Sequence, residues 1–504
     1  MNLMMLLEMA SSGMGERTAL QCGEDRWSNS ELFAAAGRAA QRIRESGAEH
    51  VSVLDVSSPA VPVALFAAAW AGVPFVPLNY RLTGAELDAL IERVTPALLI
   101  TDAERSEALA SRSGLTVVER DAFLADARSG PVPSDPDWSM EPEDIAILLF
   151  TSGTTGAPKA AVLRHKHMVS YILGSVEFMA ADPEAAALVC VPPYHVAGMA
   201  AVLSSLYSGR RIVQLPNFTA EAWLDTVRDA GVTNAFVVPT MLARIVDVLE
   251  ESGASAPSTL QALAYGGGKM PLPVIERAMR FFPDAAFTNA YGLTETSSTI
   301  AVLGPDEHRA AAGSADPAAR RRLGSAGRPL PGVEVEIRDP EGKPVPVGER
   351  GEICVRGEQV SGEYLGRGSQ LVADGWFPTN DGGSLDEDGY LFVEGRIDDV
   401  IVRGGENLSP GEIEDVLHDH PDVQDCAVVG IPDEQWGEAV AASVVLKPGA
   451  SASTSDLQDW VRKHLRSSRV PQLLHLASEL PYNETGKLLR RKVREQLGNE
   501  GDVA

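Results

Sequence analysis

Short strand-like runs alternate with helical patterns along most of the chain, and this alternation constrains the fold more than any other feature. The runs are rich in Val, Ile, Leu and Phe and lie at 51–56, 73–78, 97–102, 188–193, 211–216 and 234–240. Strands that alternate with helices are typical of parallel-sheet α/β architecture. The sequence therefore predicts an α/β fold for the greater part of the chain.

The C-terminal part shows a different pattern. Helical and strand-like segments follow one another there, with helices expected at 412–420 and 457–468 and strands at 425–432 and 439–446. These segments predict a small α+β unit. Because 504 residues are too many for one ordinary core, two or more domains are expected, with the boundary at 396–399. Two stretches rich in Pro, Asp, Gly and Ala, 126–144 and 304–324, are predicted to be loops.

The composition limits the classes of partner and compartment. The formal net charge is −27 and the sequence pI about 4.7, which argues against nucleic acid as a partner. An anionic substrate must therefore be bound by local groups. The cysteines form no CxxC pair, so neither a zinc site nor a disulfide framework is expected, and a reducing cytoplasm fits best. The first residues lack a basic region, so no signal peptide is predicted.

One apolar stretch, 61–78, is long enough to cross a membrane. However, Pro62, Gly72, Pro74 and Pro77 would break a membrane-spanning helix near both of its ends. A buried helix followed by a buried strand explains the pattern better, so no membrane span is predicted.

The strongest chemical signal is a loop of small and hydroxyl residues after a buried strand. Residues 146–150 read Ala-Ile-Leu-Leu-Phe, and residues 151–159 read Thr-Ser-Gly-Thr-Thr-Gly-Ala-Pro-Lys. Glycines let backbone N–H groups approach an anion, hydroxyls donate to phosphate oxygens, and a lysine supplies a positive charge. A flexible turn is the alternative, but a turn does not require this combination. The spacing differs from that of an ordinary P-loop, so the loop predicts phosphate binding of another type.

This loop resembles the phosphate-binding signature of the adenylate-forming superfamily, which includes acyl-CoA synthetases, peptide-synthetase adenylation domains and firefly-type luciferases. Further segments resemble the later signatures of that superfamily in the same order, namely 289–295 (Asn-Ala-Tyr-Gly-Leu-Thr-Glu), 376–381 (Trp-Phe-Pro-Thr-Asn-Asp), 395–401 with 404–407, and 481–487 (Pro-Tyr-Asn-Glu-Thr-Gly-Lys). The resemblance spans nearly the whole chain. It implies activation of a carboxylic acid by ATP as an acyl-AMP, followed by transfer to coenzyme A.

The resemblance assigns roles to individual residues. Tyr291 would stack on adenine, Thr294 would bind the α-phosphate, and Glu295 would be a ligand of Mg²⁺, a cation that prefers carboxylate oxygen. Asp381 would accept the ribose hydroxyls with assistance from Arg396. The complete ATP-binding set that the resemblance implies is Thr151, Ser152, Gly153, Thr154, Thr155, Gly156, Lys159, Gly267, Gly268, Asn289, Tyr291, Gly292, Asp381 and Arg396.

The resemblance also implies two domains that move. A large N-terminal α/β domain of several subdomains (1–396) would be joined by a hinge (397–399, with Asp398 at its centre) to a small, mobile α+β domain (400–504). Lys487 would hold carboxylate and phosphate together during adenylation. After rotation of the small domain, the loop at Gly404 and Gly405 would face the pantetheine of coenzyme A. The arginines that follow Lys487, including Arg490, are expected on a solvated helix face.

Three positions depart from the superfamily pattern. Ala160 stands where glycine is usual, and Asn380 replaces a glycine in the ribose motif, although Asn tolerates left-handed backbone better than most residues. The third is Lys269, in the segment Tyr-Gly-Gly-Gly-Lys-Met at 265–270, where the superfamily commonly has Gly-Gly-Ala-Pro. The first two are compatible with ATP chemistry, whereas the third concerns the choice of acid.

The acyl pocket gives weaker signals about the acid. The segment 192–199 carries Tyr194 and His195 where amino-acid-activating domains carry an aspartate, which argues against an amino acid. His195 resembles the gate between acyl pocket and pantetheine tunnel, although a lone buried histidine is more often structural. Small residues in both pocket segments favour a bulky apolar acid. The alternative is that Lys269 pairs with a second carboxylate, and we favour an exposed lysine instead.

Three other functions are alternatives to an acyl-CoA synthetase. An acyl-AMP ligase would pass the acyl group to a carrier protein or a partner enzyme, and an assay with free coenzyme A distinguishes the two. An oxidative luciferase-like enzyme and a catalytically silent ATP sensor share the scaffold. Nothing in the sequence demands oxygen chemistry, and the retained Glu295, Asp381 and Lys487 argue against a silent sensor. A homodimer is compatible with every one of these alternatives.

Overall fold

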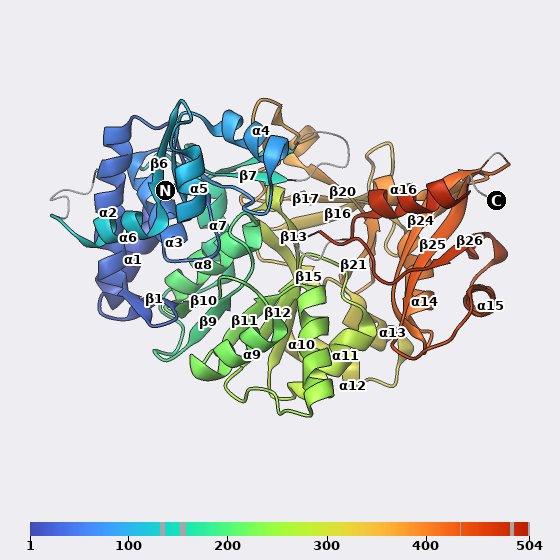
Figure 1. Cartoon of the computed structure of the whole chain (residues 1–504). Coiled ribbons are helices and arrows are strands. Elements are labelled where there is room, and N and C mark those ends of the chain that lie inside the picture. Colours follow the sequence, from blue (N-terminus) through green and yellow to red (C-terminus); the bar gives the residue numbers. More distant parts are fainter. Residues whose placement is uncertain (132–136, 152–157, 434, 484–487, 502–504) are drawn as a thin grey trace.

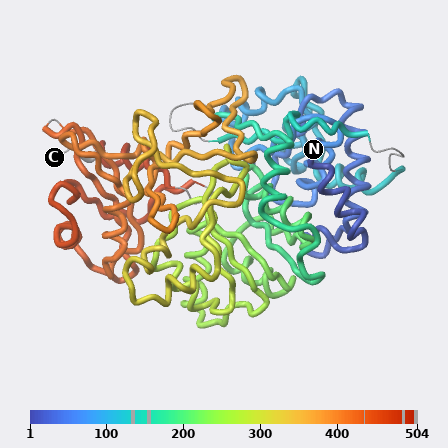
Figure 2. Tube along the Cα trace, turned by 180° about the vertical axis from the view of Figure 1, so that it is seen from behind, coloured from blue at the N-terminus to red at the C-terminus, as the bar shows by residue number. Residues whose placement is uncertain are grey.

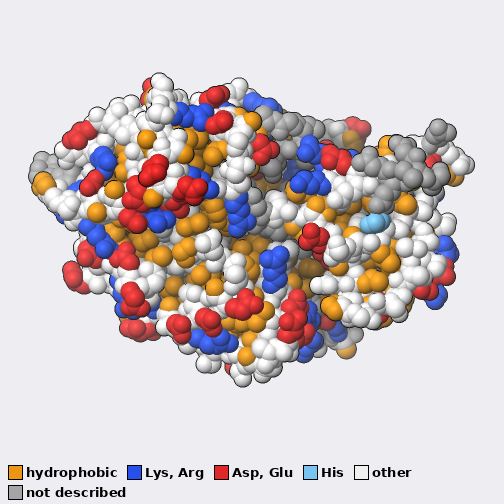
Figure 3. All heavy atoms as spheres, in the orientation of Figure 1, with side chains coloured by type: hydrophobic (Ala, Val, Ile, Leu, Met, Phe, Trp, Pro, Cys, Tyr) orange, Lys and Arg blue, Asp and Glu red, His pale blue; other side chains and the backbone are white. Residues whose placement is uncertain are grey.

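The computed structural model describes residues 1–131, 137–151, 158–433, 435–483 and 488–501. Figure 1 shows three parts that follow one another along the chain: a blue N-terminal part, a green central part, and an orange to red C-terminal part at one end of the molecule. The view from behind in Figure 2 shows the same succession. On the face shown in Figure 3, acidic and basic side chains are interspersed among apolar ones rather than gathered into one continuous basic field.

A nine-stranded sheet forms the central part and extends into the N-terminal part. Its strands, in spatial order, are β15 (Arg328–Pro329), β14 (Ser298–Leu303), β13 (Ala286–Leu293), β12 (Ala262–Gly266), β11 (Asn234–Val237), β9 (Ala186–Val189), β10 (Arg211–Gln214), β1 (Thr18–Cys22) and β2 (Asp25–Ser28). The inner strands pair in parallel, and antiparallel strands occur only towards the two edges. The predicted parallel α/β architecture is confirmed.

An eight-stranded sheet lies in the N-terminal part. Its order is β19 (Gly368–Ser369), β18 (Glu363–Tyr364), β8 (Lys159–Arg164), β7 (Ile145–Thr151), β4 (Phe75–Pro77), β3 (His50–Leu54), β5 (Ala97–Thr101) and β6 (Leu115–Glu119). Strand β7 alternates between two cores, because Ile147 and Leu149 join one buried cluster while Leu148 joins another. Both faces of this sheet are therefore covered.

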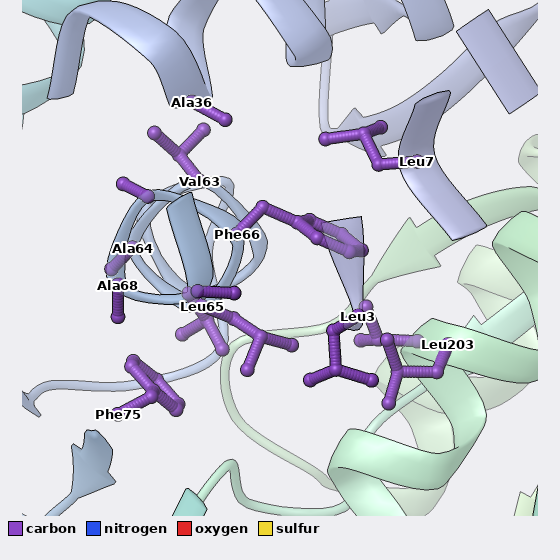
Figure 4. Packing of buried hydrophobic residues seen from close by; sticks show 14 of the residues in the cluster. Leu3, Leu7, Ala36, Val63, Ala64, Leu65, Phe66, Ala68, Phe75 and Leu203 are labelled. Atoms are coloured by element: carbon purple, nitrogen blue, oxygen red, sulfur yellow. The ribbon is translucent and has the colours of Figure 1, made fainter. Parts of the chain in front are cut away.

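The larger of these cores lies between the two sheets and contains the apolar stretch that resembled a membrane span. Helix α3 (Ala60–Ala71) is buried at every position from Ala60 to Trp70. Figure 4 shows Phe66 and Leu65 of this helix among side chains from α1 (Met4–Met14), α2 (Asn29–Ser46) and α8 (Val196–Ser208). Burial of such side chains stabilises the fold by about 25 cal/mol per Å². Within the described residues, no helix is long and apolar enough to span a membrane.

Helices on the outer faces complete the layers. Buried residues of α9 (Ala220–Asp229), α10 (Pro239–Ser252) and α11 (Leu272–Phe281) pack on the central strands of the nine-stranded sheet. The stretch 304–324 was predicted to be a loop, and this prediction is wrong. It contains α12 (Pro305–Gly313) and α13 (Pro317–Arg321), each with proline in its first turn, where the missing N–H costs no hydrogen bond.

Two smaller sheets follow. An antiparallel four-stranded sheet contains β16 (Glu334–Arg338), β17 (Gly351–Arg356), β20 (Phe377–Leu385) and β21 (Leu391–Arg396). The C-terminal sheet is five-stranded and contains β23 (Glu406–Leu408), β22 (Ile401–Arg403), β25 (Gly437–Leu446), β24 (Val423–Asp433) and β26 (Leu473–Leu476). It packs with α14 (Pro410–His418), α15 (Thr454–His464) and α16 (Arg490–Gly501) in two buried clusters that draw only on residues 401–497. A short 3₁₀ helix, Ile397–Asp399, joins the two sheets.

Candidate functional site

The predicted ligand-binding segments lie at the carboxyl ends of parallel strands. Strand β7 ends at Thr151, β9 is followed by the segment with His195, and β12 is followed directly by Gly267 and Gly268. Tyr291 lies near the end of β13. In open α/β sheets, ligands bind outside the carboxyl ends of the strands, so β7 of the eight-stranded sheet and β9, β12 and β13 of the nine-stranded sheet each end where a ligand is expected.

The structure describes the two ends of the predicted phosphate loop. Thr151 and Lys159 are antiparallel partners at the ends of β7 and β8, and the Thr151 hydroxyl lies 3.4 Å from the Lys159 carbonyl oxygen, to which it donates. The hairpin thus holds the lysine beside the start of the loop. Ser152, Gly153, Thr154, Thr155 and Gly156 lie outside the described residues.

Tyr291, Asp381 and Arg396 form a hydrogen-bonded group. The Tyr291 hydroxyl donates to Asp381 Oδ2 at 2.7 Å, and Arg396 Nη1 donates to Asp381 Oδ1 at 3.1 Å. Asp381 and Arg396 are cross-strand partners of β20 and β21, so the sheet register fixes their separation. Burial and the adjacent Asp381 carboxylate raise the pKa of the Tyr291 phenol well above its ordinary value. The phenol stays protonated and holds the carboxylate in place.

A second group surrounds Glu295, which lies with Thr294 in a short 3₁₀ helix after β13. The Glu295 side chain is buried, and Tyr364 of β18 donates its hydroxyl hydrogen to Oε1. The Lys159 Nζ atom lies 5.3 Å from the centre of the Tyr364 ring. Burial and Glu295 raise the pKa of Tyr364. Tyr364 therefore links the metal-ligand candidate to the phosphate-loop lysine.

Sequence reasoning missed Tyr364. The tyrosine belongs to a two-residue strand in a stretch without one of the quoted signatures, so no spacing rule pointed to it. Its position depends on β18 pairing with β8, where Tyr364 is the partner of Ala161. This pairing, together with hydrogen bonds from the backbone N–H groups of Ser361 and Gly362 to the Glu295 carbonyl oxygen, brings the hydroxyl to Glu295.

Glycines and Asn289 shape the backbone around the nucleotide-side strands. Gly267 has φ of 80°, in the left-handed region that disfavours other residues. A Cβ atom on Gly292 would lie 1.8 Å from the Ser298 carbonyl oxygen, so only glycine fits beside β14. Asn289 donates from Nδ2 to the Ser325 carbonyl oxygen at 2.8 Å. Asn380 has φ of 59°, which confirms the predicted left-handed turn in the ribose motif.

His195 lies at the start of α8 and is partly buried, with its Nε2 atom shielded from solvent. Its Nε2 atom has no hydrogen-bond partner within the described part of the chain, and its ring centroid is 4.5 Å from that of Tyr194. Burial lowers the pKa of His195 to about 3, with a smaller contribution from Arg81. The imidazole is therefore neutral at physiological pH and has one nitrogen available for a ligand.

The predicted C-terminal residues lie in a different environment. Gly404 and Gly405 have φ of 57° and 85°, and a Cβ atom on Gly404 would lie 2.8 Å from the Trp436 ring. Asp398, at the predicted hinge, accepts a hydrogen bond from Asn380 at 2.5 Å. Lys487 lies outside the described residues. On either side of it, Tyr482 and Leu488 form an isolated antiparallel bridge.

The expectation that Arg490 lies on a solvated helix face is wrong. Its guanidinium pairs with both carboxylate oxygens of the buried Glu414 and lies 3.5 Å from Asp399. Burial opposes this charge, but the Glu414 carboxylate dominates and raises the pKa of Arg490. Arg491, the next residue, is exposed as expected.

Comparison with known proteins identifies the family of the chain. Residues 7–365 match the family described as "AMP-binding enzyme", residues 412–487 match the "AMP-binding enzyme C-terminal domain", and the chain belongs to this family. The adenylate-forming resemblance is thereby confirmed. The chain is an AMP-forming acid–thiol ligase that activates a carboxylic acid with ATP and Mg²⁺.

Individual relatives are similar over almost their whole length. A fatty acid–[acyl-carrier-protein] ligase, ScoC, of Streptomyces coeruleorubidus is 33% identical, with 93% of this chain and 91% of the relative covered. A feruloyl-CoA synthase of an Amycolatopsis species is 33% identical, with 95% and 96% covered. The o-succinylbenzoate CoA synthetase of Bacillus subtilis, solved with its acyl-adenylate intermediate, has a TM-score of 0.84 at 28% identity, with 97% of each chain covered.

Proposed function

We propose that the strand-end residues form the adenylation site. The observation that carries this proposal is the Tyr291–Asp381–Arg396 group beside the Glu295–Tyr364–Lys159 group. In the first group Tyr291 offers a face for adenine and Asp381 offers oxygens to the ribose hydroxyls. Because the phenol and the guanidinium already hold the carboxylate, little reorganisation is needed when the nucleotide binds.

The second group suits a magnesium ion bound to the phosphates of ATP. Mg²⁺ is usually held by one or two carboxylates together with substrate phosphates. Among the described residues no cluster of three or more acidic, histidine or cysteine ligands occurs, and Glu295 is a single buried carboxylate beside the phosphate-loop lysine. Glu295 would hold the ion, which neutralises phosphate charge, while Thr294 and Lys159 would contact phosphate oxygens directly.

The division of labour between the domains is part of the proposal. We place the large domain at 1–396, the hinge at 397–399 and the small domain at 400–504. Lys487 would bring carboxylate and α-phosphate together in one orientation, and the Gly404–Gly405 loop would serve thioester formation in the other. The separate C-terminal cores and the short 3₁₀ connection at 397–399 support this boundary.

The acid is proposed to be a bulky, mostly apolar monocarboxylic acid, with an aromatic ring as the favoured case. Feruloyl-CoA synthase is named for a monocarboxylic acid with a benzene ring, whereas o-succinylbenzoate CoA synthetase is named for an acid that has the ring together with a second carboxyl group. The small residues of the pocket segments support bulk less than the sequence suggested. Gly198 and Gly266 leave no free space, because a Cβ atom on each would lie 2.9 Å and 2.2 Å from a backbone oxygen. At Gly267 and Gly268 there is space for a Cβ atom, which would lie 3.6 Å and 3.7 Å from the nearest side-chain atoms.

The alternative with a dicarboxylic acid loses support. Lys269 Nζ lies 2.7 Å from Asp415 Oδ1, so in this orientation its charge is already paired. We also propose free coenzyme A, rather than a carrier protein, as the acceptor, and a reducing compartment such as the cytoplasm. The four cysteines are free, and Cys190, Cys354 and Cys426 are buried.

The decisive experiment is exchange of labelled pyrophosphate into ATP, measured with a panel of acids. We expect exchange only with Mg²⁺ and a suitable acid, with ferulate-like acids far above acetate and malonate. AMP and acyl-CoA should then appear together when coenzyme A is added. Acid-dependent release of ADP would overturn the adenylation proposal, and product formation only with a carrier protein would overturn the choice of acceptor.

A further inference from the structure

Lys269 extends away from its own segment and contacts the C-terminal part of the chain. It follows the glycines at the end of β12, in the segment proposed to border the acyl pocket. Its ammonium lies 2.7 and 2.8 Å from the two carboxylate oxygens of Asp415 in α14, and 3.5 Å from the Gly411 carbonyl oxygen. One lysine thus binds both the first turn and the middle of this helix.

The start of α14 is packed tightly at this seam. A Cβ atom on Gly411 would lie 2.8 Å from the Glu394 carbonyl oxygen in β21, so the helix approaches the strand as closely as only glycine allows. The Ser409 hydroxyl donates to the same carbonyl oxygen at 3.4 Å. The start of α14 therefore has two contacts with the preceding part of the chain: its backbone packs against β21, and Asp415 pairs with Lys269.

A neighbouring position of α14 connects to the hinge. Glu414, the neighbour of Asp415, is buried and paired with Arg490, which also lies 3.5 Å from Asp399. Burial alone would raise the pKa of Glu414, but the Arg490 charge outweighs it and the pKa is lowered. This buried pair lies wholly within the C-terminal part and its hinge, whereas the Lys269–Asp415 pair crosses the seam.

The two pairs differ in how easily they break. The side chains of Lys269 and Asp415 are 46% and 60% exposed, so water can replace the partner of each at little cost. Arg490 and Glu414 are 21% and 9% exposed, and separating them would leave an uncompensated buried charge. A rotation about residues 397–399 would therefore break the first pair and retain the second.

We propose that Lys269 is a positioning residue: its ion pair with Asp415 is a releasable latch that favours the domain orientation seen here and links the acyl-pocket segment to the mobile domain. This inference rests on the proposed alternation of the two domains. Lys269 departs from the superfamily pattern, and the latch explains why a charged residue stands at that position. The pair does not touch the nucleotide groups, so it should alter which half-reaction is favoured rather than abolish either.

The test uses charge reversal in the full-length protein. Lys269→Glu should change the ratio of the adenylation rate to the rate of thioester formation from supplied acyl-AMP by about two- to five-fold, the size expected for a half-exposed pair. Asp415→Lys should change the ratio in the same direction. The double variant Lys269→Glu/Asp415→Lys, which restores opposite charges, should return it towards the original value. Arg309→Glu, which reverses the charge of the exposed Arg309–Asp306 pair within α12, should leave the ratio unchanged.

A structural measurement accompanies the rates. Spin labels at the exposed positions Ser252 and Ser455 report the distance between the large and small domains. We expect the single reversals to broaden the distance distribution and the double variant to narrow it again. An unchanged ratio and distribution in both single variants, or failure of the double variant to restore them, overturns the latch.

A substrate role for Lys269 gives a different result. If Lys269 binds a second carboxylate of the acid, Lys269→Glu raises KM for the acid while Asp415→Lys does not, and the latch is wrong. Failure of the proposed function is recognised separately, because the unaltered protein would then show no acid-dependent pyrophosphate exchange.

Discussion

The two regions that carry the predicted site residues differ in how those residues are held. In the large region, Tyr291, Asp381 and Arg396 hydrogen-bond to one another, and Glu295 is held by Tyr364. In the C-terminal region, Gly404 packs against Trp436, which lies in the turn directly before β25. The groups of the proposed nucleotide site are thus positioned in advance by strand pairing, whereas the proposed function requires the C-terminal groups to be brought to the substrate by movement. This contrast explains how one chain could perform two half-reactions.

The largest effect is expected from removing the charge of Glu295. Glu295→Gln keeps the shape of the side chain but loses the anionic ligand, and loss of one positioned electrostatic group costs roughly 10²- to 10³-fold in rate. Pyrophosphate exchange should fall by that factor. Glu363→Gln is the matched control. Glu363 lies beside Tyr364 on the same short strand, but its carboxylate pairs with Arg164. An equal loss in both variants would contradict a metal-ligand role for Glu295.

A smaller effect is expected from Tyr364→Phe, which leaves the ring beside Lys159 and removes only the hydrogen bond to Glu295. Groups that orient a metal ligand typically contribute about 10- to 100-fold to metal affinity or activity. The Mg²⁺ concentration for half-maximal exchange should rise by about ten-fold, and binding of Mg²⁺–ATP measured by calorimetry should weaken. Tyr390→Phe removes a comparable bond to Glu307 and should change neither quantity. Unchanged Mg²⁺ dependence in Tyr364→Phe would contradict the link.

The two regions should also differ in how pH affects their stability, because His165 and His167 are buried in the N-terminal part. His165 and His167 accept backbone N–H groups at Nδ1, and burial lowers the pKa of each from 6.5 to about 4. Between these values the unfolded chain binds protons that the folded chain does not, so stability falls as pH falls from about 6.5 towards 4. At pH 5 each ring should lower the free energy of unfolding by about 2 kcal/mol relative to pH 7.5.

Urea unfolding at pH 7.5 and pH 5 measures this effect. The double variant His165→Gln/His167→Gln retains acceptors for the two N–H groups but cannot titrate, so its loss of stability between the two pH values should be smaller. His464→Gln, which replaces an exposed histidine of the C-terminal region, should lose as much stability as the original protein. An identical pH dependence in all three proteins would rule out His165 and His167 as its source.

Much of the fold could be predicted from the sequence because its signals are local. The alternating runs gave the parallel sheets, and the prolines and glycine around α3 identified a core helix. The stretch 304–324 was misread because its Pro and Ala content suits a loop as well as a helix that starts with proline. The four-stranded antiparallel sheet was not predicted, because the sequence that forms it shows no clear alternation of strand-like and helical runs.

Side-chain partners across long sequence distances were the part that could not be predicted. Lys269 was expected at an exposed edge, and it is half-exposed, but its partner Asp415 lies far along the chain in the C-terminal part. Arg490 was misplaced because a basic helix looks solvated unless the buried Glu414 opposite it is known. Tyr364 escaped notice for the same reason, since contacts between residues far apart in the chain bring it to its partner Glu295.

The most direct test of the two-region account is Lys487→Ala, with the two half-reactions measured separately. The account predicts that adenylation falls by roughly 10²- to 10³-fold, because one positioned charge is lost, while thioester formation from supplied acyl-AMP stays near its original rate. Lys492→Ala, a change at an exposed lysine of α16, should affect neither. An equal fall of both half-reactions in Lys487→Ala would contradict the account.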